Sequence, residues 1–298
     1  CHYCNRLNLP IRCAVNPVLG RETEFAVLKP AAKRKKVVVV GGGPAGMEAA
    51  IVASARGHEV VLFEKSNQLG GNVIVASGPP FKGDMRRFLA WLVHQTEKAA
   101  NVTVKLNTAA TPEMVQAEKA DVVIVAVGSE PLVPTIPGVD GANVVEAGQV
   151  HLGKAAVGER VVVAGGGLTG CEAALHLAQE GKKVTVVEMV DERELLSDVH
   201  DIMKFALLDL FQKHGVRVIT EVKIEEITAG GVVVMDKEWK RYTIPADTVV
   251  LALGFKARAD LARSFAETAP DVYIIGDAVK PQNVKAAIHD GFNVAVEI

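Results

Sequence analysis

The sequence lacks a marked charge of either sign, a long apolar run and a secretory signal. Its 298 residues include 33 Lys and Arg against 35 Asp and Glu, so the formal net charge of −2 indicates no nucleic-acid or anionic-membrane partner. Glycine and glutamate break the apolar stretches well short of the roughly 20 residues that span a bilayer. With no signal peptide in view, a composition of 49% apolar and 23% charged residues predicts a cytoplasmic globular protein of two domains.

Cysteine is scarce and unevenly placed. Three of the four cysteines, Cys1, Cys4 and Cys13, lie within the first thirteen residues, and Cys171 stands alone. Clustering of this kind without a secretory signal favours a reducing compartment and a metal centre over structural disulfides. Cys171 lies at the start of a predicted helix, and we expect it to be a small buried residue rather than a reactive thiol.

The sequence does contain a repeated strand–turn–helix–strand pattern. Its alternating strand and helix signals predict an α/β fold with parallel sheets, and the all-apolar run 37–40 is typical of a central strand buried on both faces. Gly165 follows Gly41 by 124 residues, and Glu188 follows Glu64 by the same 124 residues. The repeat therefore predicts two Rossmann-like dinucleotide-binding domains, with the Pro- and Gly-rich residues 131–141 as the crossover between them.

Each copy carries a G-x-G-x-x-G fingerprint between a strand and a helix, with an acidic residue at the end of the next strand. The first glycine makes the tight turn, the second lets a pyrophosphate approach the backbone, and the third lets the helix pack on the strand. The helix N-terminus offers N–H groups to the phosphates, and the acidic residue accepts hydrogen bonds from the ribose. The expected binding residues are Gly41, Gly43, Pro44, Ala45, Gly46, Glu64 and Lys65 in the first copy, and Gly165, Gly167, Leu168, Thr169, Gly170 and Glu188 in the second.

Glu188 also indicates which nicotinamide cofactor the second copy prefers. A carboxylate at this place binds a ribose 2′-hydroxyl and repels a 2′-phosphate, which favours NADH over NADPH. Arg193 lies five residues further on and could reach a phosphate, so NADPH stays open as the less favoured alternative.

Two helices between these landmarks carry apolar residues at helical spacing. Both patterns predict a helix that covers a sheet. The first stripe is Met85, Phe88, Leu89 and Leu92, and the second is Ile202, Phe205, Ala206 and Leu210. Lys82, just before the first helix, is expected to face solvent, with a place near a cofactor as the alternative.

From about Val37 to the C-terminus, the chain resembles the two-dinucleotide-binding flavoproteins. The resemblance implies that FAD occupies the first site, that Asp277 holds its ribityl chain, and that the nicotinamide cofactor occupies the second site. The motifs that carry it are Leu69-Gly70-Gly71, Ala126-Val127-Gly128-Ser129, with Val127 where the family usually has Thr, and Ile275-Gly276-Asp277-Ala278. The implied FAD contacts are Gly70, Gly71, Ala126, Gly128, Gly276 and Asp277.

The order of these motifs implies a nested architecture. Residues 1–35 would form a linker, residues 36–145 and 254–298 the FAD domain, and residues 146–253 an inserted NAD(P)H domain. A helix beginning near Asn283 would point its N-terminus at the flavin and stabilise the reduced, anionic form. Many proteins of this fold carry a redox-active cysteine pair beside the flavin, but no pair follows Gly71. Disulfide reduction is therefore excluded as the activity.

The N-terminal cysteines indicate another route for the electrons. Closely spaced cysteine thiolates hold iron–sulfur clusters or zinc. Cys1-x-x-Cys4-Asn5, Cys13-Ala14-Val15-Asn16-Pro17 and Gly20-Arg21-Glu22 resemble the linker of the family that contains 2,4-dienoyl-CoA reductase, the enoate reductases and trimethylamine dehydrogenase. That family joins an FMN-bearing (β/α)₈ barrel of the old-yellow-enzyme type to a [4Fe–4S] linker and a segment like this chain. The resemblance implies Cys1, Cys4 and Cys13 as cluster ligands and an electron path from NAD(P)H through FAD and the cluster to FMN.

The motif departs from that family at the third of its four cysteines, which usually follows the second closely. Arg6, Leu7 and Asn8 occupy that place. Either the cluster is incomplete, or a loop with the missing cysteine is absent from the sequence. The start at Cys1 favours the missing loop and a fragment of a longer protein, and His2 is a less favoured alternative ligand.

Three functions stay open from the sequence. The first is an NADH-dependent flavoprotein module that feeds a barrel domain reducing an activated alkene of the enoate or dienoyl-CoA type. The second is an ADP-binding scaffold without turnover, as in trimethylamine dehydrogenase, which the intact second fingerprint disfavours. The third is a separate NADH:acceptor reductase subunit. Hydride transfer between the cofactors requires no acid or base from the protein, so no catalytic residue is predicted. An oligomer is compatible with the sequence.

Overall fold

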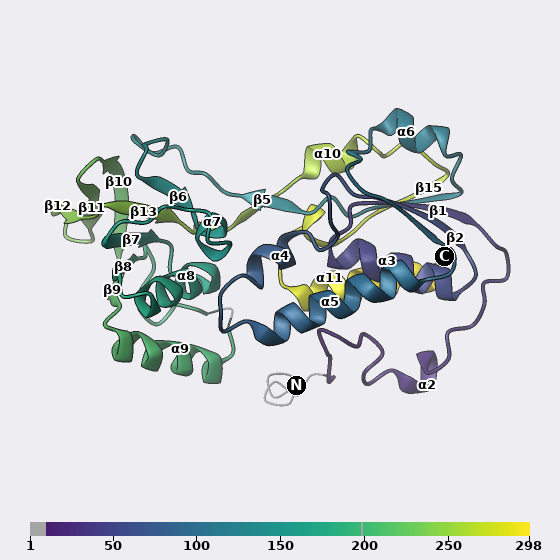
Figure 1. The fold of residues 1–298 in the computed structure, drawn as a ribbon, viewed down its shortest axis with the longest axis horizontal. Helices are drawn as coiled ribbons and strands as arrows, with labels where there is room; N and C mark the ends of the chain where they lie inside the picture. Colours follow the sequence, from purple (N-terminus) through teal and green to yellow (C-terminus); the bar gives the residue numbers. More distant parts are fainter. Residues whose placement is uncertain (1–9, 198) are drawn as a thin grey trace. The chain divides into compact units, whose positions relative to one another are not determined.

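The computed structural model describes residues 10–197 and 199–298, which form two compact units (Figure 1). The first unit comprises the described residues up to Ile74 together with Asp84–Glu130 and Lys256–Ile298, and the second comprises Val75–Gly83 and Pro131–Phe255. Strands β5 (Ser129–Pro131) and β14 (Phe255–Ala257) carry the chain into the second unit and back. The predicted α/β class, with one unit inserted in the other, is confirmed. Cys1, His2 and Cys4 lie outside the described residues.

A five-stranded parallel sheet forms the centre of the first unit, in the order β15-β4-β1-β2-β3. Val37 and Val39 of β1 join the core on one face, and Val38 and Val40 join the core on the other. The central strand is thus buried on both faces, as its apolar run predicts. The strands are β1 (Lys36–Val40), β2 (Glu59–Phe63), β3 (Val102–Lys105), β4 (Val122–Val125) and β15 (Asp271–Ile274).

Helices cover both faces of this sheet. Helices α3 (Pro44–Ala55), α5 (Gly83–Lys98) and α11 (Val284–Glu297) lie together on one face (Figure 1). Val115 of α6 (Pro112–Ala117) and Ala262 of α10 (Ala259–Arg263) belong to the core of the other face. The unit also contains the short helix α2 (Glu22–Phe25) and the 3-10 helix η1 (Gly276–Ala278). A further short helix, α4 (Asn72–Ala76), begins in the first unit and ends in the second.

The second unit repeats the parallel sheet and adds an antiparallel one. Its parallel sheet has the order β6-β13-β7-β8-β9, and a three-stranded sheet has the order β10-β11-β12. The parallel strands are β6 (Val144–Glu146), β7 (Arg160–Ala164), β8 (Lys183–Val187), β9 (Arg217–Ile219) and β13 (Thr248–Leu251). The antiparallel strands are β10 (Val222–Thr228), β11 (Gly231–Asp236) and β12 (Arg241–Pro245).

The two faces of this second parallel sheet are covered differently. Helices α7 (Ala147–His151), α8 (Leu168–Gln179) and α9 (Asp201–His214) share a core with Val161 and Val163 of β7. On the other face, Val162 of β7 packs in a core with Val232 and Val234 of the antiparallel sheet. Among the described residues, none of the helices has the length and apolar character required to traverse a bilayer.

The predicted stripe of the helix at 83–98 is confirmed at Phe88, Leu89 and Leu92. The predicted stripe of α9 is wrong at Ile202, Phe205 and Ala206, which are exposed, whereas its fourth residue, Leu210, packs against the core. In α5, Leu92 is fully buried, and Phe88 and Leu89 pack against the same core. In α9, Ile202 and Phe205 are 62% and 68% exposed, whereas the buried residues are Leu207 and Phe211. Helix α9 carries apolar residues on two faces, so periodicity alone does not show which face meets the sheet.

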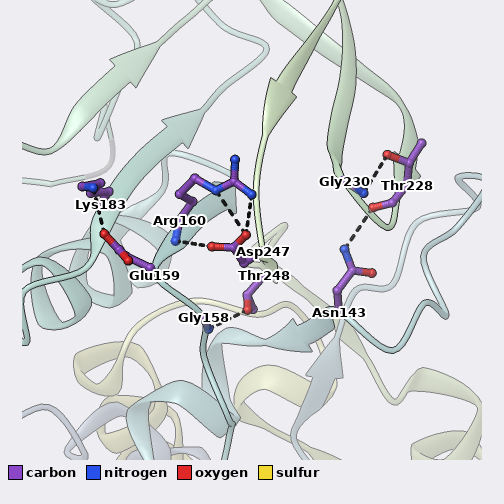
Figure 2. Close-up of polar contacts among 9 residues, drawn as sticks. All are labelled: Asn143, Gly158, Glu159, Arg160, Lys183, Thr228, Gly230, Asp247 and Thr248. Carbon is purple, nitrogen blue, oxygen red and sulfur yellow. Dashed lines mark hydrogen bonds and ion pairs between the residues drawn. The ribbon is translucent and has the colours of Figure 1, made fainter.

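Charged residues at the strand entrances tie the second unit together (Figure 2). Asp247 accepts hydrogen bonds from the Arg160 backbone at 2.8 Å and from its guanidinium at 2.5 Å, and the pKa of Asp247 is lowered to about 2 mainly by these bonds. Lys183 pairs with Glu159 at 2.7 Å. A hollow of about 460 Å³ lies at these strand starts, lined by residues that include Arg160, Lys183 and Arg217. The Gly-rich turns follow the opposite ends of the strands, so this hollow is separate from them.

Candidate functional site

The first Gly-rich turn needs two of its glycines for its own shape. Gly41 has φ +109°, and a Cβ on it would collide with the carbonyl oxygen of Ala126. A Cβ on Gly46 would collide with the carbonyl oxygen of Gly41. These two glycines let β1 turn sharply into α3 and let α3 begin close to the strand, as the fingerprint predicts.

Gly43 has no such internal reason to be glycine. Its φ of −75° and ψ of −179° are ordinary extended values, and a Cβ on it would meet no described atom within 4 Å. It stands at the N-cap of α3, where the first N–H groups of the helix have no partner within the helix. The fold itself therefore does not require a glycine at this position, and the space beside the start of the helix is open.

Glu64 is held against the same turn. It is 6% exposed, and its carboxylate accepts hydrogen bonds from the backbone N–H groups of Gly42 and Ser66, each at 2.7 Å. These contacts fix the carboxylate at the mouth of the turn, where an adenosine ribose would lie. Pro44 and Ala45 begin α3, and Lys65 is exposed beside Glu64.

The structure brings the other predicted flavin motifs of the first unit together. The Gly70 N–H donates to the Gly42 carbonyl at 2.8 Å, and a Cβ on Gly71 would lie 3.0 Å from the Cα of Gly43. The Ala126 carbonyl contacts Gly41, and Gly128 turns the chain with φ +71°. Residues scattered along the sequence thus surround one turn.

Asp277 joins this group through Ser129, the last residue of one predicted motif, and through residues that follow two others. The Ser129 hydroxyl donates to Asp277 at 3.0 Å, the Asn72 amide donates to the Ser129 oxygen at 3.2 Å, and the Gln282 N–H donates to Asp277 at 3.0 Å. The Gly276 N–H donates to the Asp290 carboxylate at 3.1 Å. Sequence reasoning missed Asn72 and Asp290. Only the position of Asn72, directly after Gly71, could have signalled it.

The turn of the second unit has the same construction. Gly165 has φ +109°, and a Cβ on it would collide with the Ala252 carbonyl, while one on Gly170 would collide with the Gly165 carbonyl. Gly167 again has ordinary dihedral angles, −70° and 176°, and a Cβ on it would meet no described atom within 4 Å. Leu168 and Thr169 begin α8. This turn is therefore equally open to a phosphate at the start of its helix.

Glu188 repeats the part of Glu64. Its carboxylate accepts hydrogen bonds from the N–H groups of Gly166 and Met189, each at 2.6 Å. Arg193 is exposed in a stretch with three acidic residues, and its backbone N–H donates to one of them, Asp191, at 2.7 Å. The acidic stretch consists of Asp191, Glu192 and Glu194.

Comparison with known proteins bears directly on these paired turns. Residues 35–291 match the family described as pyridine nucleotide-disulphide oxidoreductase. The chain belongs to this family. Its members are NAD(P)H-dependent flavin oxidoreductases, which agrees with two dinucleotide-binding units in one chain.

Two related sequences and one solved structure show which members of the family this chain resembles. The chain is 42% identical to an NADH oxidase of Thermoanaerobacter brockii, over 98% of this chain and 45% of that protein. It is 41% identical to a cinnamate reductase of Clostridium sporogenes, over 97% of this chain and 43% of that protein. A solved 2-naphthoyl-CoA reductase complex superimposes with a TM-score of 0.93 at 37% identity, over 100% of this chain and 45% of that one.

The chain thus spans less than half the length of these relatives. It is a flavoprotein oxidoreductase module related to the enoate and CoA-ester reductases, and its family binds FAD and NAD(P)H. The family name includes disulphide reduction, but the described residues hold no disulfide, and neither Cys13 nor Cys171 is bonded to another cysteine among them. Cys171 is fully buried, and its thiol donates to the Gly166 carbonyl at 3.3 Å, as expected of a small buried residue.

In this pyridine nucleotide-disulphide oxidoreductase, the expectation that Lys82 faces solvent is wrong. The side chain is 17% exposed and forms an ion pair with Glu172 of α8. Burial raises the pKa of the Glu172 carboxyl, and the Lys82 ammonium opposes that rise. Lys82 belongs to Val75–Gly83, a segment that packs in the second unit, so its burial depends on a contact between residues far apart in sequence.

Two buried histidines belong to the same unit. His151 is 3% exposed and His176 is 7% exposed. Burial, together with the nearby charges of His176 and Lys82, lowers the pKa of His151 to about 4. His151 is therefore neutral at physiological pH. His176 contacts Glu180 at 3.4 Å, one turn further along α8.

Cys13 is the one predicted metal ligand within the described residues. Its sulfur accepts the Val15 N–H at 3.4 Å, and its carbonyl oxygen lies 2.9 Å from Nε2 of His289. The described part of the chain contains no group of three potential metal ligands. Because Cys1 and Cys4 lie outside it, the set of three predicted ligands stays a prediction.

Proposed function

We propose that this chain takes hydride from NADH onto FAD and passes the electrons through a [4Fe–4S] cluster to an FMN barrel. The barrel, in a part of the protein beyond this chain, would reduce an activated alkene of the enoate or dienoyl-CoA type. When bound, the cofactors supply the redox chemistry. The protein supplies two binding sites and their electrostatics.

The observation that carries the proposal is the pair Gly43 and Gly167. Neither backbone strain nor neighbouring atoms require glycine at these positions. A ligand that approaches the backbone at the start of α3 and of α8 does require it. The same unexplained glycine in both units supports two bound dinucleotides rather than one.

The residues around each turn support different cofactors. In the first unit, Asp277 is fixed beside the Ser129 hydroxyl, so its carboxylate is available to hydroxyl groups of a ribityl chain. The proposed FAD residues are Gly41, Gly43, Pro44, Ala45, Gly46, Glu64, Lys65, Gly70, Gly71, Ala126, Gly128, Gly276 and Asp277. The proposed NADH residues are Gly165, Gly167, Leu168, Thr169, Gly170 and Glu188. The proposal places the FAD domain at 36–145 and 254–298 and the NAD(P)H domain at 146–253. The two compact units divide instead after Glu130 and after Phe255, and Val75–Gly83 belongs to the second unit.

The charge around Glu188 supports NADH over NADPH. Asp191, Glu192 and Glu194 follow it and are exposed. A 2′-phosphate near these carboxylates would be repelled, and Arg193 alone would have to offset them. Glu188 itself would accept the hydrogen bonds of a free 2′-hydroxyl.

The electron exit rests on the cysteine motif and on the relatives. We propose Cys1, Cys4 and Cys13 as ligands, and we propose that the remaining ligand, the family's third cysteine, belongs to a loop absent from the sequence. The relatives are more than twice as long as the part they share with this chain, and two of them are named for the reduction of cinnamate and of 2-naphthoyl-CoA. These names support an unsaturated acid or CoA ester as substrate in a cytoplasmic enzyme.

An anaerobic titration tests the proposal. NADH, and separately NADPH, would be added to the purified protein while its visible spectrum is followed. We expect NADH to bleach a flavin band rapidly and NADPH to do so much more slowly. A colourless protein that releases ADP on denaturation would instead identify a nucleotide-bound scaffold. Transfer to a separately encoded acceptor protein would identify an electron-donating subunit.

A further inference from the structure

The segment that carries Cys13 is fastened to α11, the last helix of the first unit. At one end, Nε2 of His289 lies 2.9 Å from the Cys13 carbonyl oxygen. At the other end, the Arg21 guanidinium donates to the Asn293 side chain at 2.7 Å and lies over the ring of Phe25 at 4.3 Å. Phe25 in turn packs edge-on against Phe292 at 5.2 Å. Phe292 and Asn293 follow His289 by three and four residues, so these contacts lie on one face of α11.

The residue after His289 reaches the flavin motif. Asp290 accepts the Gly276 N–H at 3.1 Å, and Gly276 directly precedes Asp277. Gly276 has φ +63°, and its position beside Ala45 of α3 leaves a Cβ only 3.1 Å from the Ala45 side chain. Two adjacent residues of α11 therefore contact, respectively, the predicted cluster ligand and the turn predicted to hold the flavin.

We propose that His289 and Asp290 form a bridge that fixes the cluster segment relative to the flavin turn and so sets the rate of electron transfer from FAD to the cluster. This inference rests on the proposed function. The contacts form a short continuous path: Cys13 carbonyl, His289 ring, the peptide link to Asp290, its carboxylate, and the Gly276 N–H. Both are positioning residues, because neither is placed to react with a substrate.

The bridge has a structural basis for being rigid. His289 is 7% exposed, and its neighbours on α11, Ile288 and Phe292, are fully or almost fully buried. Gly291 lets α11 approach the backbone of α3 at Ala45 and Ala49. Electron transfer between two bound centres slows as the distance between them grows, so its rate depends on how firmly the cluster segment is held. Loss of the His289 contact should therefore slow the transfer between the centres without changing hydride transfer at the nicotinamide site.

The test compares variants in the full-length, cofactor-loaded protein. H289F removes the N–H donor but keeps a ring of similar size, and D290A removes the acceptor. H289Q and D290N keep a donor and an acceptor and should restore most of the function. E297Q, an exposed position on the same helix, is the control.

Two readouts separate the bridge from general damage. Hydrogen exchange of the backbone amides between residues 13 and 25 should accelerate at least tenfold in H289F and stay unchanged in E297Q. In anaerobic stopped-flow mixing of H289F with NADH, flavin bleaching should stay within about twofold of wild type. The cluster signal, followed by freeze-quench EPR, should form at least tenfold more slowly. If D290A does not retain FAD, its cluster signal cannot be interpreted, and the test of the bridge then rests on H289F.

The outcomes also separate this inference from the proposed function. Cluster reduction at the wild-type rate in H289F and D290A would overturn the bridge and leave the electron path intact. A wild-type protein whose flavin is bleached but which holds no cluster would overturn the electron path, and with it the role of the bridge.

Discussion

In both units a glutamate stands two residues after the last glycine of the turn, and the two are 124 residues apart. Glu48 is 6% exposed and Glu172 is 7% exposed. Glu172 has the ammonium of Lys82 as its partner, whereas no hydrogen bond or ion pair reaches Glu48 from residues 10–197 and 199–298. Burial raises the pKa of both carboxyls, that of Glu48 to about 7. At the same sequence position, the carboxylate of Glu172 is thus paired with an ammonium group, whereas the carboxyl of Glu48 has no such partner and is about half protonated at pH 7.

The difference separates the features that both repeated units share from a contact that only one of them has. The turns agree in glycine conformation, in carbonyl contacts and in the carboxylates of Glu64 and Glu188. These features depend on residues within each repeat. The partner of Glu172 arrives on Val75–Gly83, which lies outside the second repeat in sequence but packs in the second unit. Each of the following experiments acts on one unit and uses the other as its reference.

The largest effect is expected from a side chain at the open glycine of either turn. G43V should yield a protein without FAD, and G167V should keep FAD but lose its reduction by NADH, because each side chain fills the space for one pyrophosphate. The loss of affinity should be at least about a hundredfold. Flavin content and NADH titration measure it, with circular dichroism to show that the fold persists.

The control for the glycine pair is G230A, where a Cβ also meets no described atom within 4 Å but no fingerprint is present. It should keep both cofactors. Retention of FAD by G43V would contradict the assignment of the first turn.

Removal of Lys82 should leave Glu172 buried without a partner, like Glu48, and should lower the stability of the folded protein. Breaking one side of a buried ion pair leaves an uncompensated charge, and K82A should lower the free energy of unfolding by about 3–5 kcal/mol. Without the ammonium, the pKa of Glu172 rises further, so Glu172 is neutral at low pH and the loss should be smaller at pH 5 than at pH 8. Urea unfolding at both pH values checks this. K82M/E172M should recover most of the stability, and a failure to do so would show that the pair has another role.

Glu48 should destabilise the folded state, and this destabilisation should grow as the pH rises. Its folded-state pKa of about 7 lies above its unfolded value of 4.5, so the folded state binds the proton more tightly. The free energy of unfolding therefore falls as pH rises from about 4.5 to 7 and then levels off. E48Q should remove this slope and gain up to about 3 kcal/mol at pH 8, with little gain at pH 4. Equal stability of E48Q and wild type at pH 8 would show that Glu48 has a partner outside the described residues.

Replacing Glu188 should have a smaller effect, which is a weaker preference of the second unit for NADH over NADPH. A hydrogen bond to a charged group contributes about 1.5–3 kcal/mol, so E188A should bind NADH at least about tenfold more weakly. NADPH should be affected less, because the repulsion of its 2′-phosphate also disappears. The ratio of Kd values, measured by flavin reduction, would move toward NADPH. A ratio that does not change would remove Glu188 from cofactor selection.

The smallest effects are expected on the outer face of α9. I202A and F205A should change the free energy of unfolding by no more than about 0.5 kcal/mol, because both side chains are mostly exposed. L92A in α5 of the first unit, where the side chain is fully buried, should cost about 2–5 kcal/mol. Urea unfolding of the three variants tests the corrected stripe. A large cost for F205A would mean that another part of the protein covers it.

Much of the fold followed from local sequence. The apolar run of β1 predicts a strand buried on both faces, and the spacing of glycines and acidic residues predicts two similar units and their turns. These inferences succeed because each depends on residues close together in the chain, where steric limits on the turn leave few alternatives. The stripe of α9 failed because its apolar residues occupy two faces, and burial depends on where the sheet lies.

By itself, the sequence determined the α/β class, the inserted repeat and the positions of the two turns, since these depend on backbone geometry over short stretches. Only the tertiary structure decided that Lys82 pairs with Glu172 while Glu48 stays without a described partner. It also decided that Asn72, Ser129 and Asp277 meet, and that His289 and Asp290 join Cys13 to Gly276. These contacts connect residues up to 276 positions apart, and no local pattern specifies which distant side chain will be brought within hydrogen-bonding distance.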